Sequence, residues 1–229
     1  AAYPVRVPEQ RVRTFHARRG RRSQLTESRL ATLLPRYAVP PAALAPPGSP
    51  GRPTRVVVEV GCGHGAAALG FAAAHPDTHL IALDVHPPGV ARMLAAAAEA
   101  GLTNLSAELG DAVEFLTDRV PPRSLDAVHL FFPDPWPKAR HHRRRLVSPD
   151  TLDLLASRLT PDGHVLVATD WADYAAYVRA LVTQDGRFVV REATRPAWRP
   201  VAGFEAKGLA AGRAITDLAL ERATRIELE

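Results

Sequence analysis

Short apolar runs, many of them β-branched, alternate along the chain with longer stretches whose apolar side chains recur at helical spacing. The runs predict strands at residues 55–60, 79–85, 124–134, 164–170, 187–192 and 214–222. The longer stretches predict helices at residues 66–75, 89–101, 149–163 and 171–186. Strands that alternate with helices of ~10–15 residues indicate an α/β fold with a doubly wound, mainly parallel sheet and helices on both of its faces.

The first 53 residues follow a different pattern. A short helix is predicted there by apolar side chains at helical spacing, namely Leu25, Leu30, Leu33 and Leu34. Residues 38–53 are too rich in Pro, Ala and Gly for a regular element and are interpreted as a linker, either a flexible tether or an ordered wrap. We therefore expect an extension over residues 1–53 and a main domain over residues 54–229.

Length and composition narrow the class of protein. A chain of 229 residues is long enough to bury a substantial core, and no apolar run approaches the ~20 residues that span a bilayer. The first ten residues lack the apolar middle of a secretory signal, and the single cysteine, Cys62, excludes an internal disulfide. We expect a cytoplasmic protein without a metal site, because one cysteine fits a reducing compartment and no ligand cluster has suitable spacing.

The net charge of +5 is concentrated in two clusters of cations. The N-terminal cluster comprises Arg6, Arg11, Arg13, Arg18, Arg19, Arg21 and Arg22. The second cluster comprises Lys138, Arg140, Arg143, Arg144 and Arg145. A solvated basic face would account for one such cluster. Two clusters, both rich in arginine, favour a polyanionic partner, with nucleic acid as the first candidate.

A glycine-rich turn, "VVVEVGCGHG", joins the first strand of the predicted sheet to its helix. Ligands of such sheets bind at the carboxyl ends of the strands, and Gly61 and Gly63 would let the backbone approach one closely. The G-x-G-x-G spacing differs from the dinucleotide fingerprint, and Glu59, two residues before the turn, is badly placed beside a diphosphate. An acid at this strand end suits a cationic ligand that carries an amine, such as S-adenosylmethionine. The simpler alternative is a glycine turn without a ligand.

Two further acids follow the next two strands. Asp84 ends the second strand, where a carboxylate can accept both ribose hydroxyls. Asp111 lies in "LGDAVEFL", directly after a further strand, where it can accept from an adenine amino group. Together with the glycine turn, this set resembles the class I S-adenosylmethionine-dependent methyltransferases. The resemblance implies a Rossmann-like, seven-stranded sheet that ends in an antiparallel hairpin, here residues 187–192 and 214–222.

The fourth strand that the alternating pattern predicts runs into "FPDPWPKARHHRRRLV". Asp134 lies where this fold brings the methyl acceptor, and the prolines on either side restrict its backbone. Trp136 offers a ring for base stacking; alternatively, the loop is a rigid turn and Trp136 is part of the packing. The motif closely resembles the signature of bacterial tRNA (guanine-N7-)-methyltransferases, and similar segments extend this resemblance over roughly residues 11–222.

The resemblance to that family implies roles for individual residues. The implied donor-binding residues are Glu59, Gly61, Gly63, Asp84, Asp111 and Asp134. Asp134 is also the implied catalytic residue. Substrate contacts are implied for Lys138, Asp170, Glu205 and Ala202. Ala202 stands where the family usually has Thr and has no hydroxyl, so the side-chain hydrogen bond to substrate is not expected from this position. The stretch implied to contact RNA comprises Arg140, His141, His142, Arg143, Arg144 and Arg145.

The same resemblance implies methyl transfer from S-adenosylmethionine to N7 of a guanosine in tRNA, at the variable loop. N7 carries a lone pair and no proton, so we expect Asp134 to orient the guanine and stabilise its developing positive charge rather than to abstract a proton. We expect Asp170 to accept from the guanine N1–H or N2–H₂. Two alternatives are a methyltransferase of another RNA, a protein or a small-molecule amine, and a non-catalytic RNA-binding module. Either a monomer or a homodimer is compatible with the sequence.

Overall fold

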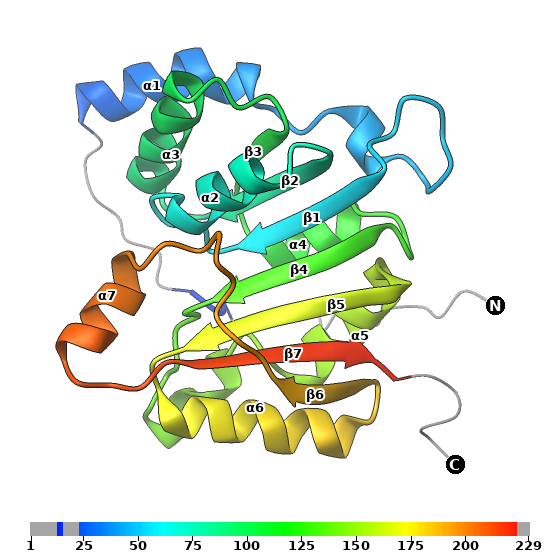
Figure 1. Cartoon of the computed structure of the whole chain (residues 1–229), viewed down its shortest axis with the longest axis vertical. Coiled ribbons are helices and arrows are strands. Elements are labelled where there is room, and N and C mark those ends of the chain that lie inside the picture. Colours follow the sequence, from blue (N-terminus) through cyan, green and yellow to red (C-terminus); the bar gives the residue numbers. More distant parts are fainter. Residues whose placement is uncertain (1–12, 16–22, 224–229) are drawn as a thin grey trace.

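The computed structural model describes residues 13–15 and 23–223, and its centre is one seven-stranded sheet (Figure 1). The strands are β1 (Arg55–Val60), β2 (Thr78–Asp84), β3 (Leu105–Leu109), β4 (Leu125–Phe131), β5 (Leu159–Thr169), β6 (Phe188–Glu192) and β7 (Thr216–Arg222). Their order across the sheet is β3-β2-β1-β4-β5-β7-β6. The pairs among β1 to β5 are parallel, whereas β7 is antiparallel to both β5 and β6. The mainly parallel sheet and its antiparallel C-terminal hairpin are thereby confirmed.

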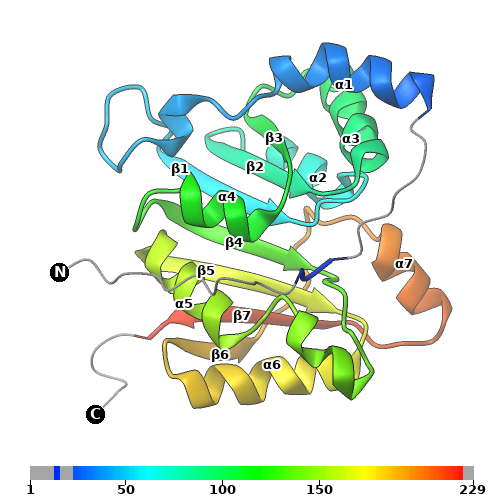
Figure 2. The ribbon, with the colours of Figure 1, turned by 180° about the vertical axis from the view of Figure 1, so that it is seen from behind.

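Helices cover both faces of this sheet (Figures 1 and 2). The helices are α1 (Gln24–Arg36), α2 (Ala66–Ala74), α3 (Pro87–Glu99), α4 (Ala112–Asp118), α5 (Pro149–Arg158), α6 (Ala172–Asp185) and α7 (Gly203–Ala210). Two 3-10 helices complete the set, η1 (Pro41–Leu44) and η2 (Ala139–Arg144). Within the described ranges, no helix combines the length and the apolar character that crossing a bilayer requires.

Alternation along the strands produces two hydrophobic cores. Val56 and Val58 of β1 belong to the cluster that includes residues of α4, α5 and α6. Val57, between them, belongs to the cluster that includes residues of α1, α2 and α3. Successive side chains of a strand point to opposite faces, so a strand that is apolar throughout must be covered on both sides.

The N-terminal extension packs onto the main domain. Helix α1 lies against α3, and its Leu30 joins the same core cluster as α2 and α3. In the segment interpreted as a linker, Val39 and Ala43 are buried in the opposite core. Arg52 closes this segment by donating to the Ala43 and Ala45 carbonyl oxygens at 2.9 and 2.6 Å. Of the two alternatives for this segment, the structure therefore favours the ordered wrap, while the boundary at residue 53 stays a prediction.

The connection between β6 and α7 crosses the face of the sheet that carries α2 (Figure 1). Trp198 in this connection stacks on His129 of β4, with ring centroids 5.2 Å apart, and meets Phe71 of α2 edge-on at 5.0 Å. Gly70 allows the approach, since a Cβ there would lie 2.2 Å from the Trp198 carbonyl oxygen. This crossing segment thus covers part of the sheet that no helix covers.

Some elements differ from the expectation. The helix expected over residues 149–163 ends at Arg158, and β5 begins directly at Leu159. Pro161 is unfavourable inside a helix, and Gly163 fits closely against the Leu125 carbonyl oxygen, 3.0 Å from where a Cβ would stand. Helices α4 and α7 are short and were not expected from the apolar pattern.

Candidate functional site

The candidate site lies at the edge of the sheet where β1, β2, β4 and β5 end (Figure 1). Parallel strands bring their carboxyl ends to one edge, which is where ligands bind in open α/β sheets. The glycine turn, the loop after β4 and helix α7 all meet this edge. Residues far apart in the sequence are therefore brought together as the alternation of strands and helices predicted.

The glycine turn has the backbone conformations that its sequence suggested. Gly61 and Gly63 have φ values of +77° and +57°, and a Cβ added to either would meet no atom within 4 Å. The turn is anchored from behind, because the Gly61 and Cys62 N–H groups donate to the Leu83 carbonyl oxygen at 2.8 and 3.0 Å. The surface of the turn is thus left open for a ligand.

Asp84 and Asp111 both make local hydrogen bonds. The two Asp84 carboxylate oxygens accept from the Gly63 N–H and the His86 N–H, each at 2.7 Å. Asp111 caps the N-terminus of α4 by accepting from the Val113 N–H at 2.8 Å. A carboxylate oxygen can accept more than one hydrogen bond, so these contacts shape the site without consuming the whole acceptor capacity.

Glu59 is almost completely buried beside the glycine turn, with 3% of its surface exposed. Its Oε2 atom has no hydrogen-bond partner among the described residues, and neither has Nδ1 of His129, 3.9 Å away. Burial raises the pKa of Glu59 to about 8, although Arg199 opposes this shift, and burial lowers the pKa of His129 to about 3. Since His129 is neutral at neutral pH, this contact is not an ion pair. A buried carboxylate oxygen without a partner is a position that a cationic ligand group can satisfy.

The loop after β4 is held in a strained conformation. Phe132 and Trp136 have φ values of +53° and +44°, which non-glycine residues rarely adopt. Asp134 lies between them and is exposed. Strain of this kind is retained when surrounding contacts fix the loop, and it is concentrated at functional sites.

Trp136 is one of those contacts. Its side chain is only 5% exposed, and its Nε1–H donates to the Thr14 carbonyl oxygen at 3.3 Å. The Arg144 guanidinium lies 4.2 Å from the centre of its ring. The expectation that Trp136 stacks on a base is therefore wrong for this structure, and the alternative, that it packs the loop, is supported.

Arg145 also serves the loop rather than the surface. It is 4% exposed, its Nε–H donates to the Pro135 carbonyl oxygen at 3.0 Å, and its guanidinium lies 4.4 Å from the Tyr177 ring centre. The expected RNA contact is thus corrected for Arg145, because a guanidinium buried under the loop cannot reach a phosphate.

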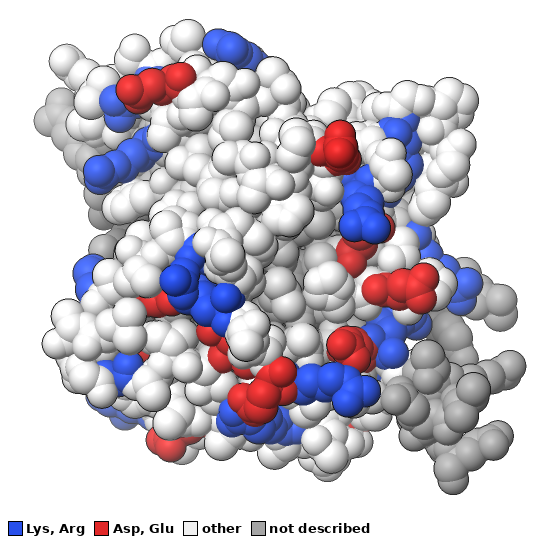
Figure 3. Space-filling model, in the orientation of Figure 1, with Lys and Arg blue, Asp and Glu red and all other residues white. Residues whose placement is uncertain are grey.

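The remaining cations of the loop are more accessible. Exposed side chains include Lys138, Arg140, His142 and Arg143, while His141 and Arg144 are half-buried. Arg13 is described, but most of the N-terminal cluster lies outside the described residues, namely Arg6, Arg11, Arg18, Arg19, Arg21 and Arg22. On the face that carries α7 and the β6–β7 hairpin, cations are interspersed with acids (Figure 3). The cations on this face therefore do not form a one-sided basic surface.

Of the four residues expected to contact substrate, Asp170, Ala202 and Glu205 lie at or beside α7, whereas Lys138 lies in the loop after β4. Asp170 follows β5 and accepts from Nε and Nη2 of Arg213 at 2.9 and 2.7 Å. Lys138, at the start of η2, is exposed. Ala202 is the N-cap residue of α7 and supplies no side-chain hydrogen bond to the helix. The hydroxyl absent at this position is therefore also a missing helix cap.

Glu205 is buried in an ion-pair network. It is 2% exposed. Its Oε2 atom lies 3.1 Å from Nε of Arg199, and its Oε1 atom lies 3.5 Å from Nε of Arg195. Arg199, also 2% exposed, binds Asp217 at 2.6 Å. Nothing in the sequence pattern identifies Arg199, because its partners come together only through the segment that crosses the sheet.

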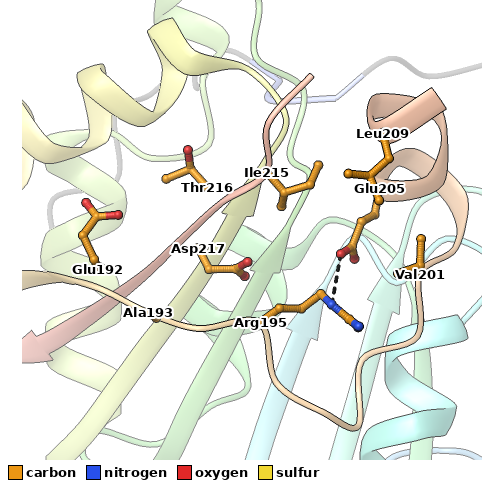
Figure 4. Close-up of a pocket in the computed structure, with 9 residues that line it drawn as sticks. All are labelled: Glu192, Ala193, Arg195, Val201, Glu205, Leu209, Ile215, Thr216 and Asp217. Atoms are coloured by element: carbon orange, nitrogen blue, oxygen red, sulfur yellow. Dashed lines mark ion pairs between the residues drawn. The ribbon is translucent and has the colours of Figure 1, made fainter. Parts of the chain in front are cut away.

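A pocket of about 400 Å³ adjoins this network, and Figure 4 shows Arg195 pointing across it toward Glu205. The lining residues are Glu192, Ala193, Arg195, Val201, Glu205, Leu209, Ile215, Thr216 and Asp217. The lining thus combines apolar side chains with several charged ones, so the pocket is largely polar. Within the described part of the chain, no group of His, Cys, Asp or Glu side chains is arranged to hold a metal ion.

Comparison with known proteins gives strong sequence matches. A family model described as "Putative methyltransferase" matches residues 53–218. The chain is 39% identical to the tRNA (guanine-N(7)-)-methyltransferase of Nitrosomonas europaea, over 92% of this chain and 96% of that protein. It is 41% identical to the tRNA (guanine-N(7)-)-methyltransferase of Halorhodospira halophila, over 90% of this chain and 93% of that protein.

Solved structures share the fold at much lower identity. The 16S rRNA methyltransferase KamB has a TM-score of 0.52 and 21% identity, over 73% of this chain and 86% of KamB. Precorrin-6y C5,15-methyltransferase from Geobacter metallireducens has a TM-score of 0.52 and 13% identity, over 73% of this chain and 81% of that chain. The Rossmann-like methyltransferase fold is thereby confirmed.

Proposed function

Because the chain belongs to the family of tRNA (guanine-N7-)-methyltransferases, we propose that it methylates N7 of a guanosine in the variable loop of tRNA, with S-adenosylmethionine as methyl donor. The product is 7-methylguanosine. The observation that carries the proposal is the placement of two acids at one edge of the sheet. Glu59 is the penultimate residue of β1, beside the open glycine turn, and Asp134 follows the neighbouring strand β4.

The residues around the glycine turn fit the methyl donor. Glu59 has a buried oxygen without a partner among the described residues, which suits the donor's ammonium group. Gly61 and Gly63 leave open space for close approach. Asp84 and Asp111 follow the next strands, where their remaining acceptor capacity suits ribose hydroxyls and an adenine amino group. Asp134 completes this set from the loop after β4.

When bound, S-adenosylmethionine supplies an electrophilic methyl group. The guanine N7 lone pair needs no prior deprotonation, so the chain's contribution is positioning and charge stabilisation. Asp134 is exposed on a loop fixed by Trp136 and Arg145, which suits it to orient the guanine through its N–H edge. The same carboxylate stabilises the positive charge that the base acquires.

Recognition of the base is assigned to acceptors around α7. Asp170, whose side chain is partly exposed, is suited to accept from the guanine N1–H and N2–H₂ groups, and a site that pairs these donors rejects adenine. Glu205 is almost completely buried, so its expected role is revised to support of this site through its ion pairs rather than direct contact with the base. Both carboxylates are held by arginines. Position 202 contributes no hydroxyl, so Ala202 can offer only its backbone groups.

The tRNA backbone is assigned to exposed and half-buried basic side chains of the loop after β4. Contacts to phosphates fix the position of the protein on the tRNA, while the pocket recognises the base. The proposed contacts are Lys138, Arg140, His141, His142, Arg143 and Arg144. Since N7 lies in the deep groove of an A-form helix, the target nucleotide must be exposed, as a variable loop allows.

We also propose that the protein acts in the cytoplasm, where tRNA is modified.

Methyl transfer from labelled S-adenosylmethionine to an unmodified tRNA transcript tests this function, followed by nucleoside analysis. We expect 7-methylguanosine in the transcript, and none when the variable-loop guanosine is replaced by adenosine. Label in both transcripts would retain an RNA methyltransferase but refute the variable-loop assignment. No label in either, with donor binding intact by calorimetry, would favour another acceptor class.

A further inference from the structure

We propose that Arg213 is a positioning residue that holds one oxygen of Asp170 so that the other oxygen is presented to the target guanine. This inference rests on the proposed function, in which Asp170 accepts a hydrogen bond from the base. It adds a residue that touches neither the base nor the methyl donor and acts through Asp170.

The hydrogen bonds between the two side chains are one-sided. Both Arg213 donors, Nε and Nη2, bind the same atom, Oδ2 of Asp170, at 2.9 and 2.7 Å. Oδ1 of Asp170 takes part in no hydrogen bond with another described residue. Hydrogen bonds between charged groups are shorter and stronger than those between neutral groups, so this pair fixes which oxygen faces the arginine.

The backbone of α7 fixes the position of Arg213. The helix ends in a Schellman motif in which Gly212 adopts a φ of +70°. The Gly212 N–H donates to the Leu209 carbonyl oxygen and the Arg213 N–H to the Gly208 carbonyl oxygen, each at 2.9 Å. Arg213 therefore leaves the helix in a defined direction, toward the end of β5.

Gly208 limits the carboxylate from the other side. A Cβ at this position would lie 2.7 Å from Cβ of Asp170 and 2.8 Å from its Oδ2 atom. Only a residue without a side chain lets the α7 backbone approach Asp170 so closely. The Asp170 carboxylate is thus confined between the α7 backbone and the Arg213 guanidinium.

This arrangement fixes the direction in which the other oxygen of Asp170, Oδ1, can accept a hydrogen bond. Asp170 is 17% exposed at the side chain, so part of the carboxylate still faces solvent and can meet a base. It follows β5, the strand next to β4, whose loop carries Asp134. Without Arg213 the carboxylate would rotate about its side-chain bonds, and the well-oriented acceptor would be lost.

The test compares Arg213→Gln with Arg213→Lys and with a control, Arg187→Gln. Arg187 is a similar, partly exposed arginine that pairs with Asp153 and Asp185 away from the site. We expect Arg213→Gln to lower kcat/KM for tRNA by roughly 10- to 100-fold, as for a lost hydrogen bond to a charged group. Arg213→Lys should recover part of the loss, and Arg187→Gln should leave kcat/KM unchanged.

Two further readings separate positioning from a general structural effect. The affinity for S-adenosylmethionine should be the same in wild type and Arg213→Gln. In an Asp170→Ala background, Arg213→Gln should cause no further loss, because the acceptor that Arg213 orients is gone. A kcat/KM of Arg213→Gln within about twofold of wild type, or an undiminished loss in the Asp170→Ala background, would overturn the assignment. Wild-type protein that binds tRNA without methylating it would refute the proposed function and this role together.

Discussion

At the scale of single residues, the two acids at the centre of the site lie in opposite surroundings. Glu59 is buried and has an oxygen without a partner among the described residues, whereas Asp134 is exposed. A buried carboxyl without a partner favours a cation that brings its own charge, and an exposed one remains open to the substrate. These surroundings fit the proposed roles, in which Glu59 contacts the methyl donor and Asp134 contacts the base.

Replacement of Asp134 tests its role most simply. Asp134→Asn keeps the shape and removes the charge that stabilises the cationic base, so kcat should fall by roughly 10²- to 10³-fold. Steady-state methyl transfer to a tRNA transcript provides the measurement. Asp118→Asn, at an exposed position in the last turn of α4, is the control and should retain wild-type kcat. Near wild-type kcat in Asp134→Asn would exclude this role.

The raised pKa of Glu59 predicts a proton-linked affinity for the donor. With a pKa of about 8, Glu59 is mostly neutral in the free protein at pH 7, and a cationic ligand group would require it to ionise. Binding at pH 7 should therefore release about one proton. Calorimetry in buffers of different ionisation enthalpy measures this number, and Glu59→Gln should abolish the release. Equal release in both proteins would show that another group is responsible.

The same pKa has a consequence for the ligand-free protein. Its folded value, about 8, lies above the ordinary value of 4.5, so the folded state holds a proton that the unfolded state loses between these pH values. The contribution of Glu59 to stability is therefore fully present below pH 4.5 and is lost as the pH rises through about 8.

At the scale of elements, strands such as β1 were predictable and α7 was not. The strand expected over residues 55–60 coincides with β1, since an apolar, β-branched run bounded by Arg and Gly has one favourable interpretation. Helix α7, "GFEAKGLA", contains two glycines and no apolar stripe. Its position depends on Glu205 and Gly208, which meet Arg199 and Asp170 from distant parts of the chain.

The N-terminus of α7 offers a test of the missing hydroxyl. Ala202→Thr should supply the absent cap and raise the free energy of unfolding by about 1 kcal/mol. Urea unfolding of the whole protein measures this change. Ala210→Thr, at the other end of the helix, is the matched control and should not stabilise. An equal effect of both substitutions would contradict the capping argument.

The site itself was predictable only in part. The acids at strand ends were found because parallel strands bring their carboxyl ends together. The role of Trp136 was misjudged, because sequence does not indicate on which side of a loop a ring lies. Arg145 was grouped with RNA contacts for the same reason, although it lies under the loop. Neighbouring arginines of similar sequence context thus lie in different surroundings, exposed at Arg140 and Arg143 and buried at Arg145.

At the scale of the whole molecule, the difference between exposed and buried arginines in the loop after β4 predicts how tRNA binding depends on salt. The affinity for tRNA should fall with a logarithmic slope of roughly −0.7 to −0.9 for each phosphate neutralised. Arg140→Gln removes an exposed cation and should reduce the slope by about one contact. Arg145→Gln should lower stability and leave the slope unchanged, because its guanidinium is buried. Binding titrations at several salt concentrations measure the slope for each variant. Equal slopes in Arg140→Gln and Arg145→Gln would contradict the distinction between exposed, RNA-binding arginines and the buried Arg145.

The central claim is that the chain methylates guanine at N7, and the most direct test changes that atom alone. A tRNA whose variable-loop guanosine is replaced by 7-deazaguanosine keeps the N1–H and N2–H₂ groups but has carbon in place of N7. We predict that this tRNA competes with the normal transcript for binding and accepts no methyl group, while the normal transcript yields 7-methylguanosine. Methylation of the 7-deazaguanosine tRNA at a rate similar to that of the normal transcript would contradict the account.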